Sequence, residues 1–257
     1  VLPDLESLLA TGIDIAVVAL PTRFHEDAAI TLAEAGVHTL VEKPIAHTIA
    51  AGRRMVDAFA AAGLVGAVGH IERFNPALLE LRRRLARGEL GEVYQVQTRR
   101  QGPFPSRIAD VGVGKDLASH DIDLTAWITG SDYARVAAET AHRSGREHED
   151  MIAITGRLEC GAIVNHLVNW LSPMKERVTI VTGEKGAFVA DTATGDLTFY
   201  ANGTVPLEWE SMAVFRGVSE GDVTRFALPK REPLRVELET FRDAVLGRPS
   251  DVVTMAQ

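Results

Sequence analysis

Two groups of residues in this sequence have the types and spacing that proton transfer beside a bound ligand requires. The first is the tripeptide Glu-Lys-Pro at 42–44, and the second is Asp116 with His120 and Asp123. Residues at i, i+4 and i+7 share one face of a helix, so a helix here aligns these three side chains. A carboxylate one turn from an imidazole orients the ring and raises its basicity, which favours a general base. A second interpretation remains open: an acid that stabilises a helix N-terminus, next to a histidine without a chemical role.

Lys43 is the candidate in the first group, because the apolar run that ends just before it predicts a parallel strand. Ligands bind outside the carboxyl ends of such strands, where a lysine can shuttle a proton or polarise a carbonyl group. The bond before Pro44 is open to the cis form, which would aim Lys43 inward. The alternative is an ordinary solvated lysine in a turn, and the local sequence is compatible with both.

The elements that must hold Lys43 alternate along the first seventy residues. Apolar runs rich in Val and Ile predict strands, and periodic stretches that end in glycine predict helices. The predicted strands are 13–20, 37–42 and 64–69, and the predicted helices are 25–36 and 48–63. Strands at this spacing with helices between them form right-handed crossovers and a parallel sheet. We therefore predict half of a doubly wound dinucleotide-binding domain, whose usual complement is six strands.

The remainder of the sequence has a different pattern. A helix begins at Pro76, and from Glu92 onward segments of alternating polarity are separated by glycine turns, as in an antiparallel sheet. The predicted strands are 93–100, 152–158, 162–168, 177–181, 188–191 and 197–200, and the predicted helices are 116–128 and 233–246. The predicted fold class is α/β plus α+β, with a partial parallel sheet in residues 1–72 and a mixed, largely antiparallel sheet domain in residues 73–257.

Composition argues against several classes of protein. The chain has 257 residues, of which 46% are hydrophobic and 24% are charged, as in globular proteins. A net charge of −8 disfavours nucleic acid as a partner, because proteins that bind it carry dense basic patches. No apolar run reaches the length of a membrane span, and the single cysteine, Cys160, excludes a disulfide within the chain. We expect a cytoplasmic protein without a metal site.

Five segments, in order along the chain, carry a resemblance to a known family. They are 14–25, 35–44, 73–76, 88–91 and 116–120, and the resemblance extends over nearly the whole chain. This set resembles the glucose–fructose oxidoreductase / inositol dehydrogenase (Gfo/Idh/MocA) family. Segments 69–76, 116–123 and 169–175 are also similar to the branch that oxidises C3 of UDP-N-acetylglucosamine or its uronic acid.

The resemblance implies a Rossmann-type fold and hydride transfer between a sugar hydroxyl carbon and a nicotinamide, NAD or NADP, with NAD favoured. It implies catalytic roles for Lys43, Asp116 and His120; we favour His120 as the base and Lys43 as the group that stabilises the alkoxide, and the reverse assignment stays open. By the same resemblance, the cofactor contacts are Pro21, Thr22, His25, Glu42, Lys43 and Arg73, and the substrate contacts are Asn75, Asp116, His120 and Asp123.

One departure from the family pattern bears on the cofactor. No G-x-G-x-x-G pattern precedes residue 13, and Gly112-Val-Gly114 is not a substitute, because no βαβ unit is predicted around it. We therefore expect a chain that is truncated at both ends and binds a dinucleotide weakly.

Three functions compete at this point. The first is a dehydrogenase of a sugar nucleotide, the second is a dehydrogenase of a free polyol or aldose such as an inositol, and the third is a non-catalytic module for binding or oligomerisation. The antiparallel sheet offers a broad face of the kind that buries contacts between identical chains, so we expect a homo-oligomer. Trp170, in the sheet domain, is interpreted as a core residue in preference to a sugar platform.

Overall fold

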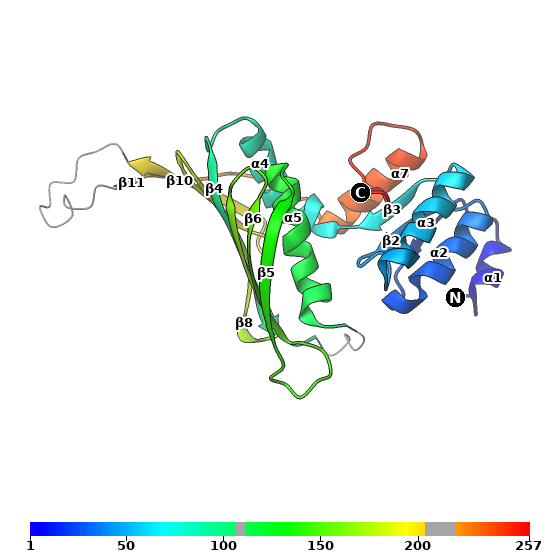
Figure 1. Cartoon of the computed structure of the whole chain (residues 1–257). Helices are drawn as coiled ribbons and strands as arrows, with labels where there is room; N and C mark the ends of the chain where they lie inside the picture. Colours follow the sequence, from blue (N-terminus) through cyan, green and yellow to red (C-terminus); the bar gives the residue numbers. More distant parts are fainter. Residues whose placement is uncertain (106–110, 204–218) are drawn as a thin grey trace, which may run out of the picture. The chain divides into compact units, whose positions relative to one another are not determined.

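The computed structural model describes residues 1–105, 111–203 and 219–257, and the chain divides into two compact units. Unit 1 comprises Val1–Phe74 together with Glu232–Gln257, and unit 2 comprises Asn75–Arg231. Figure 1 labels the elements of both units. The first division lies two residues after the boundary expected from the sequence.

Unit 1 is built on sheet A, whose three strands are parallel and follow the order β1-β2-β3. The predicted parallel sheet with intervening helices is therefore confirmed. Its strands are β1 (Ile15–Val18), β2 (His38–Glu42) and β3 (Gly66–Gly69); its helices are α1 (Leu5–Leu9), α2 (His25–Glu34), α3 (Ile49–Ala62) and α7 (Pro233–Val245), with short 3-10 turns at η1 (Thr22–Phe24) and η2 (Ile71–Phe74).

Local sequence explains how these helices begin, end and pack. The Thr48 hydroxyl accepts a hydrogen bond from the Ala51 N–H and caps α3, and Gly63 ends that helix in the left-handed conformation that favours glycine. Leu32 of α2 and Met55 of α3 are almost completely buried in one apolar cluster with strand residues. Burial of each such side chain stabilises the unit by roughly 2 kcal/mol.

The last helix, α7, groups with unit 1, whereas the sequence analysis placed it in the second domain. Phe241 of α7 is 1% exposed and packs against Leu40 and Ala67 of sheet A. The segment after the helix then pairs with β3, where the Val68 N–H donates to the Val253 carbonyl oxygen at 2.8 Å. An amphipathic helix does not specify which distant apolar surface it will cover, so the pattern predicted the helix but not its partner.

Strand β1 has β2 as its only neighbour among the described residues. Ile15 and Val17 are 47% and 50% exposed, whereas Val18 is 4% exposed. Strands of a parallel sheet are usually covered on both faces, so one face of β1 is open in this structure.

Unit 2 is built on sheet B, which has eight strands in the order β11-β10-β9-β8-β4-β7-β6-β5. Neighbouring strands are antiparallel except β4 and β7, which are parallel, so the predicted mixed, largely antiparallel sheet is confirmed. The strands are β4 (Val93–Pro103), β5 (Tyr133–Ala141), β6 (Met151–Leu158), β7 (Ile163–Asn169), β8 (Leu171–Gly183), β9 (Gly186–Asp191), β10 (Asp196–Gly203) and β11 (Ser219–Arg225). Strands β5 and β11 were not predicted.

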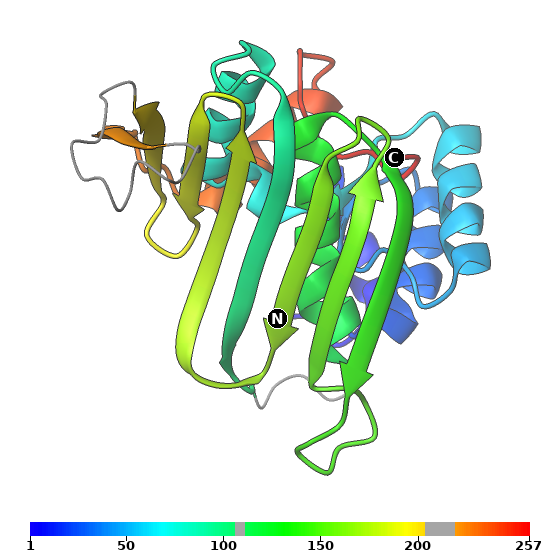
Figure 2. The ribbon, with the colours of Figure 1, turned by 60° about the vertical axis from the view of Figure 1, so that its left-hand side comes forward.

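The helices of unit 2 pack on one face of sheet B, and Figure 2 looks onto the opposite, open face. They are α4 (Pro76–Ala86) and α5 (Ser119–Thr129), and a π-helical turn, η3 (Gly114–Ala118), leads directly into α5. Leu78 of α4, Leu124 of α5 and Phe188 of β9 belong to one buried cluster between the helices and the sheet. This cluster fixes α5 against the central strands.

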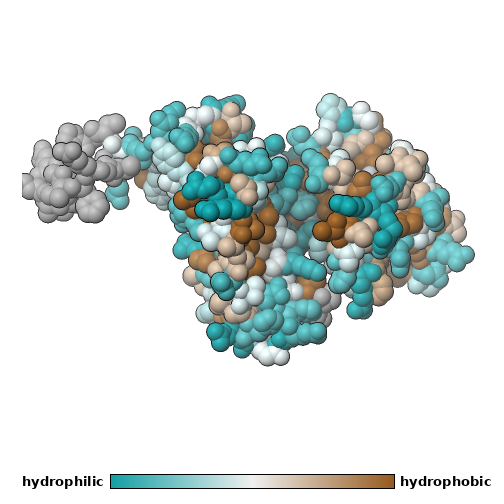
Figure 3. Space-filling model, viewed as in Figure 1, coloured by the Kyte–Doolittle hydropathy of each residue, from teal (hydrophilic) through white to brown (hydrophobic). Residues whose placement is uncertain are grey.

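Hydrophilic residues cover most of the surface visible in Figure 3, with smaller hydrophobic areas between them. In the part of the chain that the structure describes, no helix combines the length and apolarity needed to cross a membrane.

Candidate functional site

The carboxyl ends of β1, β2 and β3 meet at one edge of sheet A, because the three strands are parallel. Pro21 and Thr22 follow β1, Glu42 ends β2 with Lys43 next to it, and Arg73 lies in the turn after β3. Five of the six predicted cofactor contacts therefore come to one edge, the position at which open parallel sheets bind ligands.

The sixth predicted contact, His25, is 1% exposed and joins two of these loops. Its Nε2 lies 2.7 Å from the Leu20 carbonyl oxygen, and its Nδ1 lies 3.1 Å from the carbonyl oxygen of Pro44 and 3.3 Å from that of Ile45. Carbonyl oxygens only accept hydrogen bonds, so the ring nitrogen that carries the proton donates to its loop, and the tautomer decides which loop that is. His25 thus lies between the loop after β2 and the loop after β1, and its direct contact with a cofactor stays a prediction.

Glu42 lies against the backbone of the neighbouring strand. A Cβ at Gly69, its partner in the β2–β3 register, would lie 3.1 Å from Glu42 Oε2, so a side chain there would press on the carboxylate. Glu237 of α7 lies within electrostatic reach of Glu42 and is fully buried, and neither of its carboxyl oxygens has a hydrogen-bond partner among the described residues. Burial, with smaller contributions from the charges of Glu42 and Glu232, raises the pKa of Glu237 to about 8.

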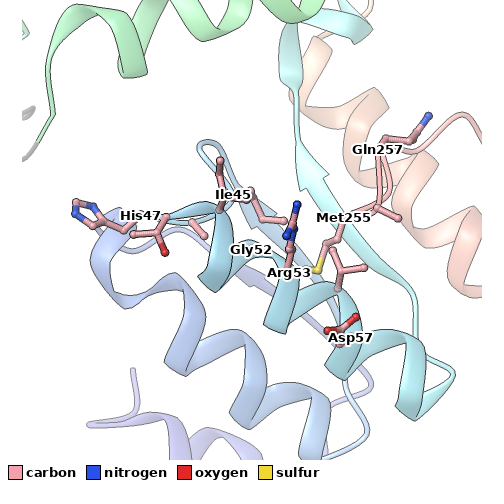
Figure 4. A pocket seen from close by; sticks show the side chains of 12 residues that line it. Ile45, His47, Gly52, Arg53, Asp57, Met255 and Gln257 are labelled. Carbon is pink, nitrogen blue, oxygen red and sulfur yellow. The ribbon is translucent and has the colours of Figure 1, made fainter.

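The Lys43–Pro44 peptide bond is cis, the form that the sequence left open. Beyond it, residues 45–49, part of α3 and residues 255–257 line a hollow of about 610 Å³. Figure 4 shows Arg53 and Asp57 extending from α3 and Met255 coming from the last segment of the chain. None of the six predicted cofactor contacts lines this hollow, so it is distinct from the edge described above.

In unit 2, the predicted acid and histidine lie where a π-helical turn becomes an α-helix. Asp116 is in the π turn, His120 is the second residue of α5, and each is 8% exposed. Asp123 is half-buried one turn later. The predicted helix is confirmed, but its first turn has hydrogen bonds from i to i+5, so the α-helical spacing assumed between Asp116 and His120 does not hold there. Such turns are rare and are often found at functional sites.

Asp121 forms a buried ion pair with Arg100 of β4. Arg100 Nε lies 3.2 Å and 3.1 Å from the two carboxylate oxygens, and the side chains are 4% and 2% exposed. The sequence analysis assigned no role to Asp121 or to Arg100. The sequence did contain a signal that Asp121 is buried. Asp121 precedes Leu124 and Ile128 by three and seven residues and so lies on the core-facing stripe of α5. A carboxylate on that stripe needs a partner.

A second buried polar chain links three strands of sheet B. The Thr98 hydroxyl lies 2.8 Å from His166 Nδ1, and the Tyr133 hydroxyl lies 2.8 Å from His166 Nε2. Burial lowers the pKa of His166 to about 4 and raises the pKa of Tyr133, so both groups are neutral at pH 7. The sequence analysis missed this chain, because a histidine in an alternating strand carries no pattern that marks its partners.

The two glycines before α5 serve the π turn. The Gly114 N–H donates to Glu149 Oε1 at 2.9 Å, and a Cβ at Gly112 would lie 2.0 Å from Glu149 Oε2. The two glycines make room for the Glu149 carboxylate at the start of the helix. This helix packs on a mixed sheet and is not part of a βαβ unit. Trp170 is 3% exposed and packs against Val113, so its interpretation as a core residue is confirmed.

Asn75 uses both ends of its side chain inside unit 2. Its Oδ1 accepts a hydrogen bond from the Ala77 N–H at 3.1 Å and caps α4, and its Nδ2 donates to the Thr192 carbonyl oxygen at 2.9 Å. These bonds give Asn75 a structural role, and its contact with a substrate stays a prediction.

Comparison with known proteins places these features in a family. Residues 1–70 match the family described as "Oxidoreductase family, NAD-binding Rossmann fold", and residues 78–189 match the "GFO/IDH/MocA C-terminal domain". The two matches fall on either side of the division between unit 1 and unit 2.

Relatives with known activities are similar over different lengths. The UDP-N-acetylglucosamine 3-dehydrogenase of Acidithiobacillus ferrooxidans is 30% identical over 247 residues, which cover 95% of this chain and 73% of that protein. A solved structure of that enzyme has a TM-score of 0.81 at 26% identity and covers 99% of this chain and 77% of its own. Inositol 2-dehydrogenase 2 of Saccharopolyspora erythraea is 33% identical over 140 residues, 54% of this chain and 41% of that protein.

The WlbA dehydrogenase of Bordetella pertussis, solved in complex with NADH and UDP-GlcNAcA, is a third similar protein. Its TM-score is 0.67 at 30% identity, over 73% of this chain and 58% of that one.

Proposed function

This chain belongs to the GFO/IDH/MocA family of NAD-binding oxidoreductases, and on that basis we propose that it transfers a hydride between C3 of a UDP-N-acetyl sugar and nicotinamide. The observation that carries the proposal is the similarity to the 3-dehydrogenase, which extends over 95% of this chain. The similarity to WlbA, with its bound sugar nucleotide, supports the same substrate class.

The edge of sheet A suits a nicotinamide cofactor. A buried histidine lies between two of its loops, and the edge presents a lysine next to a carboxylate at the carboxyl end of a strand. When bound, the nicotinamide supplies the hydride acceptor. The side chains that would hold it are those predicted from the sequence: Pro21, Thr22, His25, Glu42, Lys43 and Arg73. NAD is favoured over NADP, in keeping with the NADH in WlbA.

The proton of the sugar hydroxyl goes to a side chain in this proposal. His120, almost buried at the π–α junction, is the favoured base, and Asp116 orients it. Lys43 stabilises the developing alkoxide electrostatically. Asn75 and Asp123 complete the proposed substrate contacts.

An inositol or another free polyol is the alternative substrate. The observation that favours it is the similarity to inositol 2-dehydrogenase 2, which is higher in identity but covers about half of this chain. A third possibility is a module that binds or oligomerises without catalysis.

Self-association through the open face of sheet B is part of the proposal. Apolar side chains of β6 and β7 lie on that face with substantial exposure: Met151 at 39%, Ile163 at 43% and Leu167 at 53%. The side chains of Gln95 and Asn165 lie among them and bond each other at 2.8 Å, so a second copy related by a two-fold axis would meet a face of apolar side chains around a polar pair. A cytoplasmic location is proposed from the single cysteine.

The test is a substrate panel with NAD⁺ that includes UDP-N-acetylglucosamine, its uronic acid and myo-inositol, followed through NADH formation. Turnover of a UDP-sugar above that of the polyol is expected, and the opposite order would favour the inositol alternative. His120→Gln and Lys43→Met should each lower turnover by about 10²-fold, the scale of a positioned acid–base group. Lys185→Met, an exposed lysine in the turn between β8 and β9, serves as the matched control and should leave turnover unchanged. Near-full activity in both site variants would contradict the assignment of roles.

A further inference from the structure

The core-facing side chains of β4 change from apolar to polar along the strand. Val96, Thr98 and Arg100 are all buried on the helix side of sheet B. Val96 packs in the cluster that contains Leu124, whereas Arg100 pairs with Asp121, one turn earlier on α5. The first turn of α5, which carries His120, therefore lies over the polar part of the strand.

This placement is costly in stability. Two charged side chains that are 4% and 2% exposed lose most of their hydration, and their mutual attraction offsets that loss only in part. Apolar residues of similar volume would stabilise such a position as well or better. Stability therefore does not explain why Arg100 and Asp121 occupy it.

Directionality offers an explanation. Apolar contacts between a helix and a sheet tolerate small rotations and shifts, whereas a hydrogen-bonded ion pair depends on direction, and here the one Nε of Arg100 lies within 3.2 Å of both Asp121 carboxylate oxygens. Asp121 directly follows His120. Asp116 lies in η3, which ends two residues before His120. A rotation of α5 that kept Leu124 buried would still displace both predicted reactive side chains.

We propose that Arg100 and Asp121 are positioning residues, whose buried ion pair sets the rotation of α5 and thereby the orientation of His120 and Asp116. The inference rests on the proposed function for its catalytic consequence, but the orientation of His120 is measurable without turnover.

The test uses the full chain with Arg100→Met and Asp121→Leu combined, because the double replacement leaves no unpaired buried charge. We expect the variant to fold with an unfolding midpoint at or above that of the wild type. We also expect its kcat to fall at least about tenfold with a change in KM below about threefold, the pattern of a lost transition-state interaction. Leu124→Ala is the control, since it weakens the packing of α5 and should lower the unfolding midpoint but keeps the ion pair.

The second readout is the imidazole signal of His120 in NMR spectra, assigned by its loss in His120→Gln. Its chemical shift and titration midpoint should move in the double variant and stay in place in Leu124→Ala. Unchanged His120 signals in the double variant, or an equal displacement in Leu124→Ala, would overturn the inference. If the wild type turns over none of the sugars, the proposed function fails, and the His120 signals still decide whether the pair positions the ring.

Discussion

The carboxyl group of Glu237 provides a direct test of the unit 1 structure. It is fully buried, its oxygens have no hydrogen-bond partner among the described residues, and burial raises its pKa from 4.5 to about 8. Between these two values the unfolded chain has released the proton and the folded chain has kept it. The free energy of unfolding therefore falls as the pH rises, by about 1.4 kcal/mol per pH unit. From pH 5 to pH 8 the loss from this one group amounts to about 3 kcal/mol.

Glu237→Gln removes the titrating proton and keeps the shape of the side chain. The buried amide can cost about 1–3 kcal/mol of its own, but that cost is the same at every pH, so the slope is the informative quantity. We expect the wild type to lose stability between pH 5 and pH 8 relative to the variant, by about 3 kcal/mol. Glu239→Gln, which changes a more exposed acid on the same helix, should keep the wild-type slope.

The assay is urea unfolding followed by two signals. Far-ultraviolet circular dichroism reports the helices of both units, whereas tryptophan fluorescence reports unit 2 alone, because all three tryptophans, Trp127, Trp170 and Trp209, lie between residues 75 and 231. A change seen by dichroism and not by fluorescence therefore belongs to unit 1. The Glu237→Gln effect should appear in the dichroism transition. If the free energy of unfolding changes with pH by the same amount in the wild type and in Glu237→Gln from pH 5 to pH 8, the burial argument is refuted. Glu42→Gln should flatten the slope only slightly, since burial is the larger cause of the raised pKa.

Two further predictions concern other parts of the molecule. The pKa of Asp196 is lowered to about 2, chiefly by its hydrogen bond with Lys230. Asp196 therefore stabilises the fold above pH 4, and this contribution is lost as the pH falls toward 2. Asp196→Asn should reduce the loss of melting temperature between pH 4 and pH 2, and equal losses in wild type and variant would contradict the prediction. Gly112→Ala should destabilise the π turn by about 1 kcal/mol, because Glu149 must leave its hydrogen bond with the Gly114 N–H. Gly52→Ala on α3 should be neutral or stabilising, because the added methyl group has room. Equal unfolding midpoints for the two variants would refute this contrast.

The elements that could be predicted from the sequence are those whose residue pattern depends on their local environment and not on a particular distant partner. The strands of sheet A are short, mainly apolar runs of the kind typical of parallel sheets, and such runs are conspicuous even where one face is open, as in β1. Strand β5 was missed for the opposite reason: most of its side chains are exposed, and its residues, Tyr133–Ala141, alternate only weakly in polarity. At the edge of sheet A, Lys43 was predictable for a local reason, since it follows the end of a strand, whereas the other cofactor contacts were assigned from the family resemblance.

Features that depend on distant partners were out of reach of the sequence. The pattern of α7 predicted an amphipathic helix, but Glu237 belongs by type to its polar face and is nevertheless buried. The register change at η3 is equally hidden, because one π turn shifts the periodicity by a single residue. Arg100 lies in a strand whose alternation would suit a buried residue, and only the position of α5 shows which carboxylate it meets.

Glu237 and the Arg100–Asp121 pair follow one physical rule, although they lie in different units. Each places an ionisable group in the core next to a residue of the proposed site, Glu42 in one case and His120 in the other. Replacement of the whole Arg100–Asp121 pair by apolar residues of similar volume should leave stability unchanged or raise it. For Glu237→Gln at neutral pH, removal of the group with the raised pKa offsets the cost of the buried amide. If the groups serve the site, the same changes should lower activity, which is the usual relation between stability and function where a site requires strained or polar cores. A variant that gains stability and keeps full turnover would separate that group from the site, and the two positions can be tested independently because they belong to different units.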